Sequence, residues 1–267
     1  MTNRYTHGHH DAVVRSHRWR TAANSAAYLT PLLEPGMRVL DVGSGPGTIT
    51  ADLADLVGPN GSVTALERTE RALDLSRAEI ARRGVTTVDF VVGDAAALDL
   101  PDDRYDVVHA HQVLQHLADP VSALREMRRV CKPGGLVAAR DADYAGFVWF
   151  PAVPELERWL DLYHRVTRAN DAEADAGRRL LSWGREAGLR DLWTGSSTWC
   201  FADAADRAWW GGTWAERVVA SEFAVQAVAG DHADEAELAR LAEGWRRWAA
   251  AADGWFSLLH GELLGRA

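Results

Sequence analysis

The segment VLDVGSGPGTIT, residues 39–50, carries the strongest signal in this chain. An apolar run ends at Asp41, a glycine-rich turn follows, and a helix is predicted after the turn. Gly43, Gly45 and Gly47 permit backbone conformations and close approaches that side chains forbid. The first N–H groups of a helix have no partner inside that helix. This strand–turn–helix unit is therefore predicted to hold an anionic or polar part of a ligand.

Two well-known kinds of glycine loop fit this segment poorly. The phosphate loop of nucleotide hydrolases needs Gly-Lys-Ser or Gly-Lys-Thr, and residues 39–50 hold no lysine. The dinucleotide fingerprint GxGxxG would need glycine at position 48, where the chain has Thr48. An ordinary strand-to-helix turn would not need three glycines in five residues. The segment is therefore predicted to be a ligand-binding glycine loop that is neither of these two kinds.

Apolar runs and helical segments alternate on the C-terminal side of this loop. The runs are rich in valine and leucine and nearly continuous, as in strands buried on both faces of a parallel sheet. The runs cover residues 38–42, 62–67, 87–92, 105–110 and 136–140, and the helical segments cover 48–56, 70–82 and 120–130. The alternation predicts an α/β fold with a doubly wound sheet.

The outer segments are predicted from their own periodicity. Residues 9–29 are predicted to form one helix, and residues 189–201 one strand with a bulge at Gly195. After residue 150 amphipathic helix patterns dominate. The predicted organisation is an N-terminal cap at 1–30, a ligand-binding Rossmann-like core at 31–142, a first helical insertion at 143–188, a core strand at 189–203, a second helical insertion at 204–252 and a last core strand at 253–267.

Composition narrows the classes of function. The chain has 267 residues and a net charge of -9, so a nucleic-acid partner is not expected. Two cysteines cannot build a disulfide framework, which fits a reducing compartment. No apolar run reaches the roughly 18 residues of a membrane span, and the N-terminus lacks an apolar secretion signal. We therefore expect a soluble, cytoplasmic protein.

No metal site is predicted. The histidines of HGHH, residues 7–10, have no cysteine or carboxylate cluster nearby, and a structural zinc needs such ligands. A magnesium site needs clustered acidic residues, and Asp141 and Asp143 supply only two.

Two carboxylates follow neighbouring strands of the predicted sheet. Glu67 can accept hydrogen bonds from both hydroxyls of a ribose. Asp94, in GDAAAL, can accept from an adenine amino group while the Ala95 N–H reaches a ring nitrogen. Because ligands of open α/β sheets bind at the carboxyl ends of the strands, the glycine loop, Glu67 and Asp94 are predicted to share one rim.

With these residues the chain resembles the class I S-adenosylmethionine-dependent methyltransferases, specifically the small-molecule group similar to the enzymes of ubiquinone and menaquinone biosynthesis. The matching segments within residues 37–142 are VLDVGSGPGTIT, VTALERT, VVGDAAALDLP, YDVVHAHQVLQHLADPVSALREMRRVCKPGG and LVAARDAD. The resemblance implies a seven-stranded, mostly parallel sheet in the order 3-2-1-4-5-7-6, with helical cap and lid insertions. It also implies an antiparallel seventh strand, for which residues 255–264 are the candidate.

The resemblance further implies S-adenosylmethionine as cofactor. The glycine loop would line its methionine part, Glu67 would hold the ribose and Asp94 the adenine, with Arg68 at the adenine face. Asp41 would orient the loop amides or the cofactor's ammonium group. The full set of predicted cofactor-binding residues is Asp41, Gly43, Ser44, Gly45, Gly47, Glu67, Arg68, Asp94, Ala95, His111 and Gln112.

Several side chains are candidates for a catalytic base or for contact with the methyl acceptor. His116, in LQHLADP, and Tyr144 are the first choices for catalysis. The further candidates for the base are His9, His10, His111, Asp143 and His260. The N-terminal segment is predicted to cap the cofactor through Tyr5, His9 and Arg18, and Trp149 is predicted to contact the acceptor.

The acceptor is expected to be a small, at least partly apolar molecule. Eleven of the twelve tryptophans lie at or after residue 149, and seven of the twelve are in two segments, about 144–176 and 204–250, predicted to close over the rim. Such a lid would favour an aromatic or otherwise apolar acceptor. A catalytically silent binder of the same cofactor, a non-methylating enzyme that uses it, and a nicotinamide oxidoreductase are the alternatives. The sequence does not determine the oligomeric state, and a homodimer is one alternative.

Overall fold

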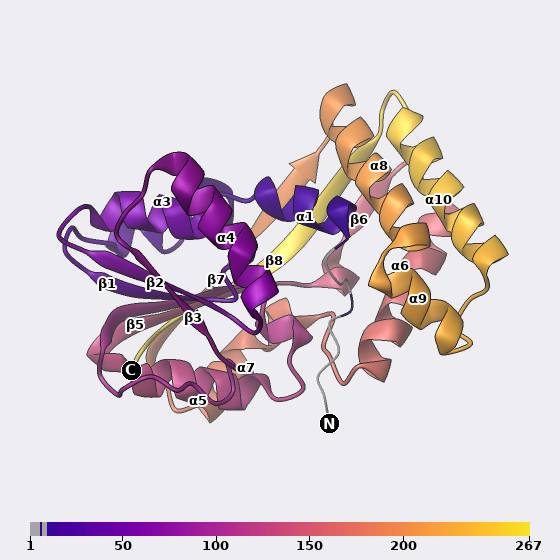
Figure 1. Cartoon of the computed structure of the whole chain (residues 1–267). Helices are drawn as coiled ribbons and strands as arrows, with labels where there is room; N and C mark the ends of the chain where they lie inside the picture. The colour runs from indigo at the N-terminus through magenta and orange to yellow at the C-terminus, as the bar shows by residue number, and fades with distance from the viewer. Residues whose placement is uncertain (1–5, 7–9) are drawn as a thin grey trace.

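The computed structural model describes residue 6 and residues 10–267, and a sheet of eight strands runs through it (Figure 1). The central strands are rich in valine and leucine and buried along most of their length, as expected of a sheet covered on both faces. The strands are β1 (Arg38–Val42), β2 (Ser62–Glu67), β3 (Val88–Val92), β4 (Tyr105–His111), β5 (Cys131–Ala142), β6 (Val148–Phe150), β7 (Arg190–Phe201) and β8 (Trp255–Arg266).

Strand pairing confirms the predicted doubly wound class. β1 pairs in parallel with β2 and β4, β2 with β3, and β4 with β5. β8 runs antiparallel to β5, as predicted for the last strand. The sheet runs β3-β2-β1-β4-β5-β8, and β7 pairs with β8 along residues 256–266, on the opposite edge from β5.

The predicted order counted seven strands and therefore missed one. The additional strand is the three-residue β6, which pairs with residues 255–257 of β8. Because β7 occupies the other edge of β8 there, β6 continues the edge that β5 uses further along. So short a strand has no period-two pattern long enough to be recognised in the sequence.

The helices form two layers over the sheet and a separate group at one end of it. Figure 1 shows α3 and α4 on one face of the sheet and α5 and α7 on the other. The helices are α1 (Asp11–Arg18), α2 (Ala22–Ser25), α3 (Thr48–Val57), α4 (Glu70–Arg83), α5 (Pro120–Val130), α6 (Pro154–Ala169), α7 (Leu180–Glu186), α8 (Ala204–Ala220), α9 (Glu222–Ala229) and α10 (Glu235–Ala250), with short 3-10 turns at Thr30–Leu32, Leu114–His116, Tyr144–Gly146 and Ala176–Arg179.

The single helix predicted over residues 9–29 is wrong, because the chain forms α1 and α2 instead. Thr21 caps α2: its Oγ1 accepts from the Asn24 amide at 3.2 Å, and Asn24 Oδ1 accepts from the Thr21 amide at 2.9 Å. Threonine and asparagine favour helix ends over helix interiors, so this pair starts a new helix. The bulge predicted at Gly195 is also misplaced, since the pairing of β7 with β8 shifts between residues 190 and 193.

Helices α6, α8, α9 and α10, called the helical bundle below, pack beyond one end of the sheet, and α1 lies beside α8 (Figure 1). Their core is aromatic. Trp214 stacks on Trp245 with ring centroids 5.7 Å apart, and Trp159 lies edge-on to both, at 4.5 and 4.8 Å. All three indoles are buried. Within the interval 143–188, α7 contacts β7, β8 and α5 instead, so it belongs to the layers of the sheet.

The backbone of Gly261 in β8 lies directly against Gly177. A substitution at Gly261 tests this close approach. A Cβ on Gly261 would lie 2.1 Å from the Gly177 carbonyl oxygen. We expect Gly261→Ala to lower the free energy of unfolding by about 1–3 kcal/mol, the usual cost of overpacking. Urea unfolding followed by tryptophan fluorescence measures this change.

The matched control is Gly212→Ala in α8, where a Cβ would meet nothing within 4 Å. Alanine favours helix over glycine by about 1 kcal/mol, so this variant should be as stable as wild type or more stable. Equal effects of the two substitutions would contradict the close approach at Gly261.

Candidate functional site

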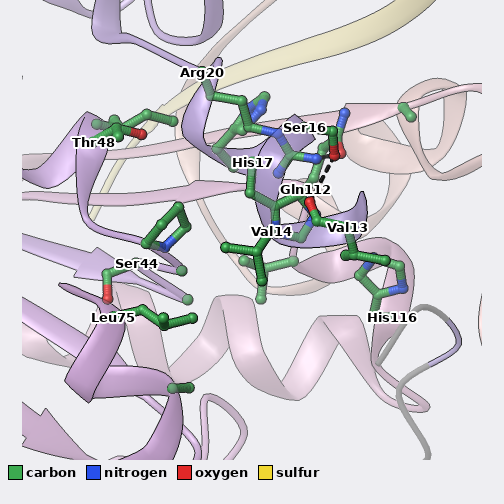
Figure 2. A pocket seen from close by; sticks show the side chains of 18 of the residues that line it. Val13, Val14, Ser16, His17, Arg20, Ser44, Thr48, Leu75, Gln112 and His116 are labelled. Atoms are coloured by element: carbon green, nitrogen blue, oxygen red, sulfur yellow. Dashed lines mark hydrogen bonds between the residues drawn. The ribbon is translucent and has the colours of Figure 1, made fainter. Parts of the chain in front are cut away.

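A cavity of about 420 Å³ lies at the carboxyl ends of β1, β2 and β4. In Figure 2 Ser44, Thr48 and Leu75 lie on one side of this cavity, and Val14 and His17 of α1 lie on the other. Helix α8 of the helical bundle completes the wall. The cavity is therefore bounded by the rim of the sheet, the N-terminal segment and the helical bundle.

The glycine loop turns sharply out of β1 at this rim. Gly43 has φ +70°, and a Cβ there would lie 2.4 Å from Val113 Cγ2. Gly45 has φ +55° and would meet nothing within 4 Å, so its backbone borders open space. The Gly43 and Ser44 amides donate to the Leu66 carbonyl at 2.8 and 3.1 Å. The loop is thus fixed to the end of β2 and presents its backbone to the cavity.

Glu67, the last residue of β2, holds the same loop through its side chain. Its Oε1 accepts from the Gly45 amide at 2.7 Å and its Oε2 from the Arg68 amide at 3.2 Å. Burial raises the pKa of Glu67, and these two amide hydrogen bonds oppose the rise. Each carboxylate oxygen keeps a lone pair for a further donor. Glu67 lines the cavity, so it is placed to accept from a diol.

Asp41 lies at the cavity but its carboxylate is engaged differently from our prediction. Its Oδ2 accepts from Thr50 Oγ1 at 2.6 Å, and its Oδ1 lies 2.9 Å from His109 Nδ1. Its side chain therefore ties β1 to α3 and β4, and its hydrogen bonds do not go to the loop amides. A buried polar side chain normally has such partners.

The structure brings most of the predicted site residues to this one cavity. Those that line it are Asp41, Gly43, Ser44, Gly45, Glu67, Arg68, His111, Gln112, His116 and Tyr144. Those that lie outside its lining are Gly47, Asp94, Ala95, Arg18 and Trp149. Tyr5 and His9 fall outside the described residues.

Local structure explains why three of the predicted residues lie outside the cavity lining. Gly47 caps α3 with φ +82°, and a Cβ there would lie 2.5 Å from Ser76 Oγ. Asp94 Oδ1 accepts from the Ala96 amide at 2.9 Å, so its carboxylate shapes a turn. Trp149 stacks on Phe256 with centroids 5.8 Å apart. The neighbouring residues Tyr144 and Phe147 line the cavity instead of Trp149.

His116 and Tyr144, the first choices for catalysis, are both uncharged at neutral pH. Burial, with the nearby charge of Arg20, lowers the pKa of His116 to about 3. Burial raises the pKa of Tyr144, whose ring stacks on Tyr163 with centroids 3.9 Å apart. A neutral imidazole with so low a pKa is a weak base. Both side chains are therefore better suited to hydrogen bonding than to removing a proton.

The sequence predicted that the N-terminal segment and residues 204–250 cover the rim, but it did not identify the charged and polar side chains that line the cavity from there. Val13, Ser16, His17 and Arg20 line the cavity, and Arg217 does so from α8. The first four follow i, i+3, i+4 and i+7 spacing, the spacing of one helical face. That signal was present in the sequence, but it does not say which structure the face covers.

Gln112 connects the N-terminal segment to the sheet. Its Oε1 accepts from Arg20 Nη2 at 2.6 Å, and its Nε2 lies 2.8 Å from His260 Nε2 of β8. Gln112 has φ +53°, which is unusual for a residue with a side chain. Such conformations cost about 1–3 kcal/mol and concentrate at functional sites. The backbone turn directly after β4 thus places this amide between Arg20 and His260.

Asp141 of β5 supports the segment that carries His116. Its Oδ1 accepts from the Gln115 amide at 3.1 Å, and the Ala142 amide donates to Gln115 Oε1 at 3.0 Å. Asp141 is fully buried, and burial raises its pKa to about 7 even though amide hydrogen bonds oppose the rise. Because an unfolded aspartate titrates near pH 4, the folded protein takes up this proton first.

The pKa of Asp141 predicts a pH-dependent effect of Asp141→Asn. The wild-type carboxyl stabilises the fold most below pH 4, and this contribution is lost as the pH rises to about 7. The free energy of unfolding of the variant minus that of wild type should therefore rise between pH 5 and 7, by about 1.4 kcal/mol per pH unit, and then level off. Urea unfolding at pH 5, 6, 7 and 8 measures it, with exposed Asp253→Asn as control. A difference that does not change with pH would contradict the assignment.

Among the described residues, no group of three or more histidine, cysteine or acidic side chains is arranged to bind a metal ion. Within the same residues, no helix combines the length and the apolar character that crossing a membrane requires.

Comparison with known proteins gives a consistent family. Residues 33–201 match the family model of a methyltransferase domain. The chain is 34% identical to an uncharacterized methyltransferase of Schizosaccharomyces pombe, over 97% of this chain and 95% of that one. It is 39% identical to a ubiquinone/menaquinone biosynthesis C-methyltransferase of Shewanella oneidensis, over 38% of this chain and 41% of that one.

The fold is similar to that of solved structures. The YcgJ protein from Bacillus subtilis matches with a TM-score of 0.57 at 20% identity, over 90% of this chain and 96% of that one. The family match and the nearly full-length relative agree with the glycine loop and the sheet order. The chain belongs to the methyltransferase domain family and is a class I S-adenosylmethionine-dependent methyltransferase.

Proposed function

We propose that this enzyme transfers a methyl group to a small, at least partly apolar acceptor in the cavity between the rim, α1 and α8. Its cofactor end has features that fit S-adenosylmethionine. Gly45 borders open space at the turn, and Glu67 presents a carboxylate beside it. Arg68 and Ala72 line the adjoining wall. Asp94 and Ala95 stay in this proposal as the adenine-binding pair that the family resemblance implies.

The other end of the cavity supports an apolar acceptor. Phe147, Trp199, Trp210, Trp214 and Leu258 line it, and aromatic walls favour ring-bearing or otherwise apolar molecules. Trp210 and Trp214 belong to α8, so the helical bundle acts as a lid in this proposal. The single observation that carries it is that one cavity contains both the glycine loop and these aromatic side chains.

The chain's own residues contribute positioning and exclusion of water. Bound S-adenosylmethionine supplies a methyl group that is already activated for transfer. The glycine loop and Glu67 fix one reactant, and the aromatic wall fixes the other. Helices α1 and α8 cover the cavity and exclude water from it. His116 and Tyr144, both uncharged, orient the acceptor through hydrogen bonds and do not need to act as strong bases.

We place the enzyme in the cytoplasm. Cys131 and Cys200 are both free thiols, which suits a reducing compartment.

The role of Glu67 gives the first test of this proposal. Glu67→Gln replaces one acceptor oxygen by an N–H donor that would face the amides of the loop. We expect it to weaken binding of S-adenosylhomocysteine by about 1–3 kcal/mol, the cost of lost hydrogen bonds in a buried site. Isothermal titration calorimetry measures the affinity. Asp253→Asn is the comparison, and it should leave the affinity unchanged because Asp253 is an exposed carboxylate that does not line the cavity. Wild-type affinity in the Glu67 variant would refute this placement of the cofactor.

Turnover separates the enzyme from a silent binder of the same cofactor. The protein should release S-adenosylhomocysteine when it is incubated with S-adenosylmethionine and a fraction of apolar small molecules from cell extract. The fraction of polar molecules serves as the control. Binding without turnover on either fraction would favour the sensor alternative, and turnover on the polar fraction alone would refute the apolar acceptor.

A further inference from the structure

We propose that the acceptor is an anion, with a ring-bearing apolar body and a carboxylate or phenolate group that Arg217 binds. The inference rests on the proposed function, because it concerns the acceptor end of the same cavity. It adds a specific charge to an acceptor that the aromatic wall defines only as apolar.

Arg217 is buried in α8 and lines the cavity. Its Nη2 donates to Ser16 Oγ and, at 3.4 Å, to the Val13 carbonyl oxygen of α1. Its guanidinium carbon lies 5.0 Å from the ring centroid of Trp214, which also lines the cavity. The hydrogen bonds and the indole face hold the guanidinium in one orientation. Arg217 is therefore a pre-positioned cation beside an aromatic wall.

Arg20 repeats this arrangement on the side of the N-terminal segment. Its Nη2 donates to Gln112, and its guanidinium carbon lies 5.7 Å from the centroid of Trp199. Burial raises the pKa of Tyr144, and the charges of Arg217 and Arg20 both act against that rise. The fields of the two arginines thus overlap at Tyr144, inside the same cavity.

The acidic residues of the cavity lie at its other end. Among the described residues that line it, the carboxylates are Asp41 and Glu67. Asp41 is engaged with Thr50 and His109, and Glu67 holds the glycine loop. The described lining of the cavity therefore has both of its carboxylates at the cofactor end, where Arg68 also lies, and Arg20 and Arg217 without a carboxylate at the acceptor end. This distribution of charge favours an anionic acceptor and disfavours a cationic one.

The chemistry of arginine indicates which kind of anionic group the acceptor carries. A planar guanidinium matches the two oxygens of a carboxylate, and such pairs are stronger than neutral hydrogen bonds. A largely apolar cavity strengthens the attraction further. The adjacent faces of Trp214 and Trp199 suit an attached ring. An acceptor oxygen that arrives ionised also needs no base, which agrees with the uncharged His116 and Tyr144.

A matched pair of probes tests the charge preference. 2-Naphthoate and 2-naphthamide have nearly the same shape and differ in charge. Calorimetric titration into the full chain saturated with S-adenosylhomocysteine should show naphthoate binding about tenfold tighter or more, as for a hydrogen bond to a charged group. Arg217→Gln should abolish this preference while S-adenosylhomocysteine binds within about threefold of its wild-type affinity. Equal binding of the two probes to wild type, no binding of either, or a preference that survives in Arg217→Gln would overturn the proposal.

Two further variants separate recognition from packing. Ser16→Ala removes one of the two hydrogen bonds that Arg217 makes to α1 but keeps the guanidinium, so the preference should survive. If Arg217→Gln fails to fold, Arg217→Lys decides: it keeps the charge but loses the planar fork, so naphthoate should bind more weakly yet still better than naphthamide. Unchanged naphthoate affinity in Arg217→Lys would overturn the proposal. If wild type does not bind S-adenosylhomocysteine, the proposed function fails, and the same titrations without it still decide the charge preference.

Discussion

The junction between the glycine loop and the end of β2 is the constraint on which the rest of the site depends. Backbone amides from Gly43 to Gly45 donate to Leu66 and Glu67, so the loop is tied to the end of the strand. This junction leaves the loop backbone, and the first turn of α3 after it, facing the cavity. It also positions the Glu67 carboxylate, because the same hydrogen bonds that hold the loop hold the side chain. Buried amides must have partners, so the sheet and the site form together.

The helical bundle serves packing and the site at once. Trp214 belongs to the stacked core with Trp245, and it also lines the cavity beside Arg217. Trp210 stacks on Phe201 with centroids 4.5 Å apart and lines the same cavity. Trp210 and Trp214 are therefore core residues and cavity-lining residues at the same time. Because the wall is an extension of a close-packed core, its shape is as fixed as that core.

Much of the sheet could be predicted from the sequence, because parallel strands buried on both faces are nearly continuous apolar runs. β1 and β2 begin and end where the sequence places them, and Glu67 follows from its position at a strand end. The arginines could not be predicted in this way. Arg20 and Arg217 reach one cavity only after α1 docks beside α8, and helical periodicity gives a face without its partner. Asp94 shows a second limit of prediction from sequence. A carboxylate at the end of a strand can bind a ligand or shape a local turn, and Asp94 accepts a hydrogen bond within such a turn.

The charge state of the site explains how such a wall can serve methyl transfer without a strong base. Burial lowers the pKa of both His111 and His116, so these two imidazoles of the cavity lining stay neutral. Arginine keeps its charge under the same burial because its pKa starts far higher. A cavity with neutral imidazoles and charged guanidiniums attracts anions but removes protons poorly. In the proposed function the remaining source of rate is positioning, which the loop on one side and the aromatic core on the other can supply.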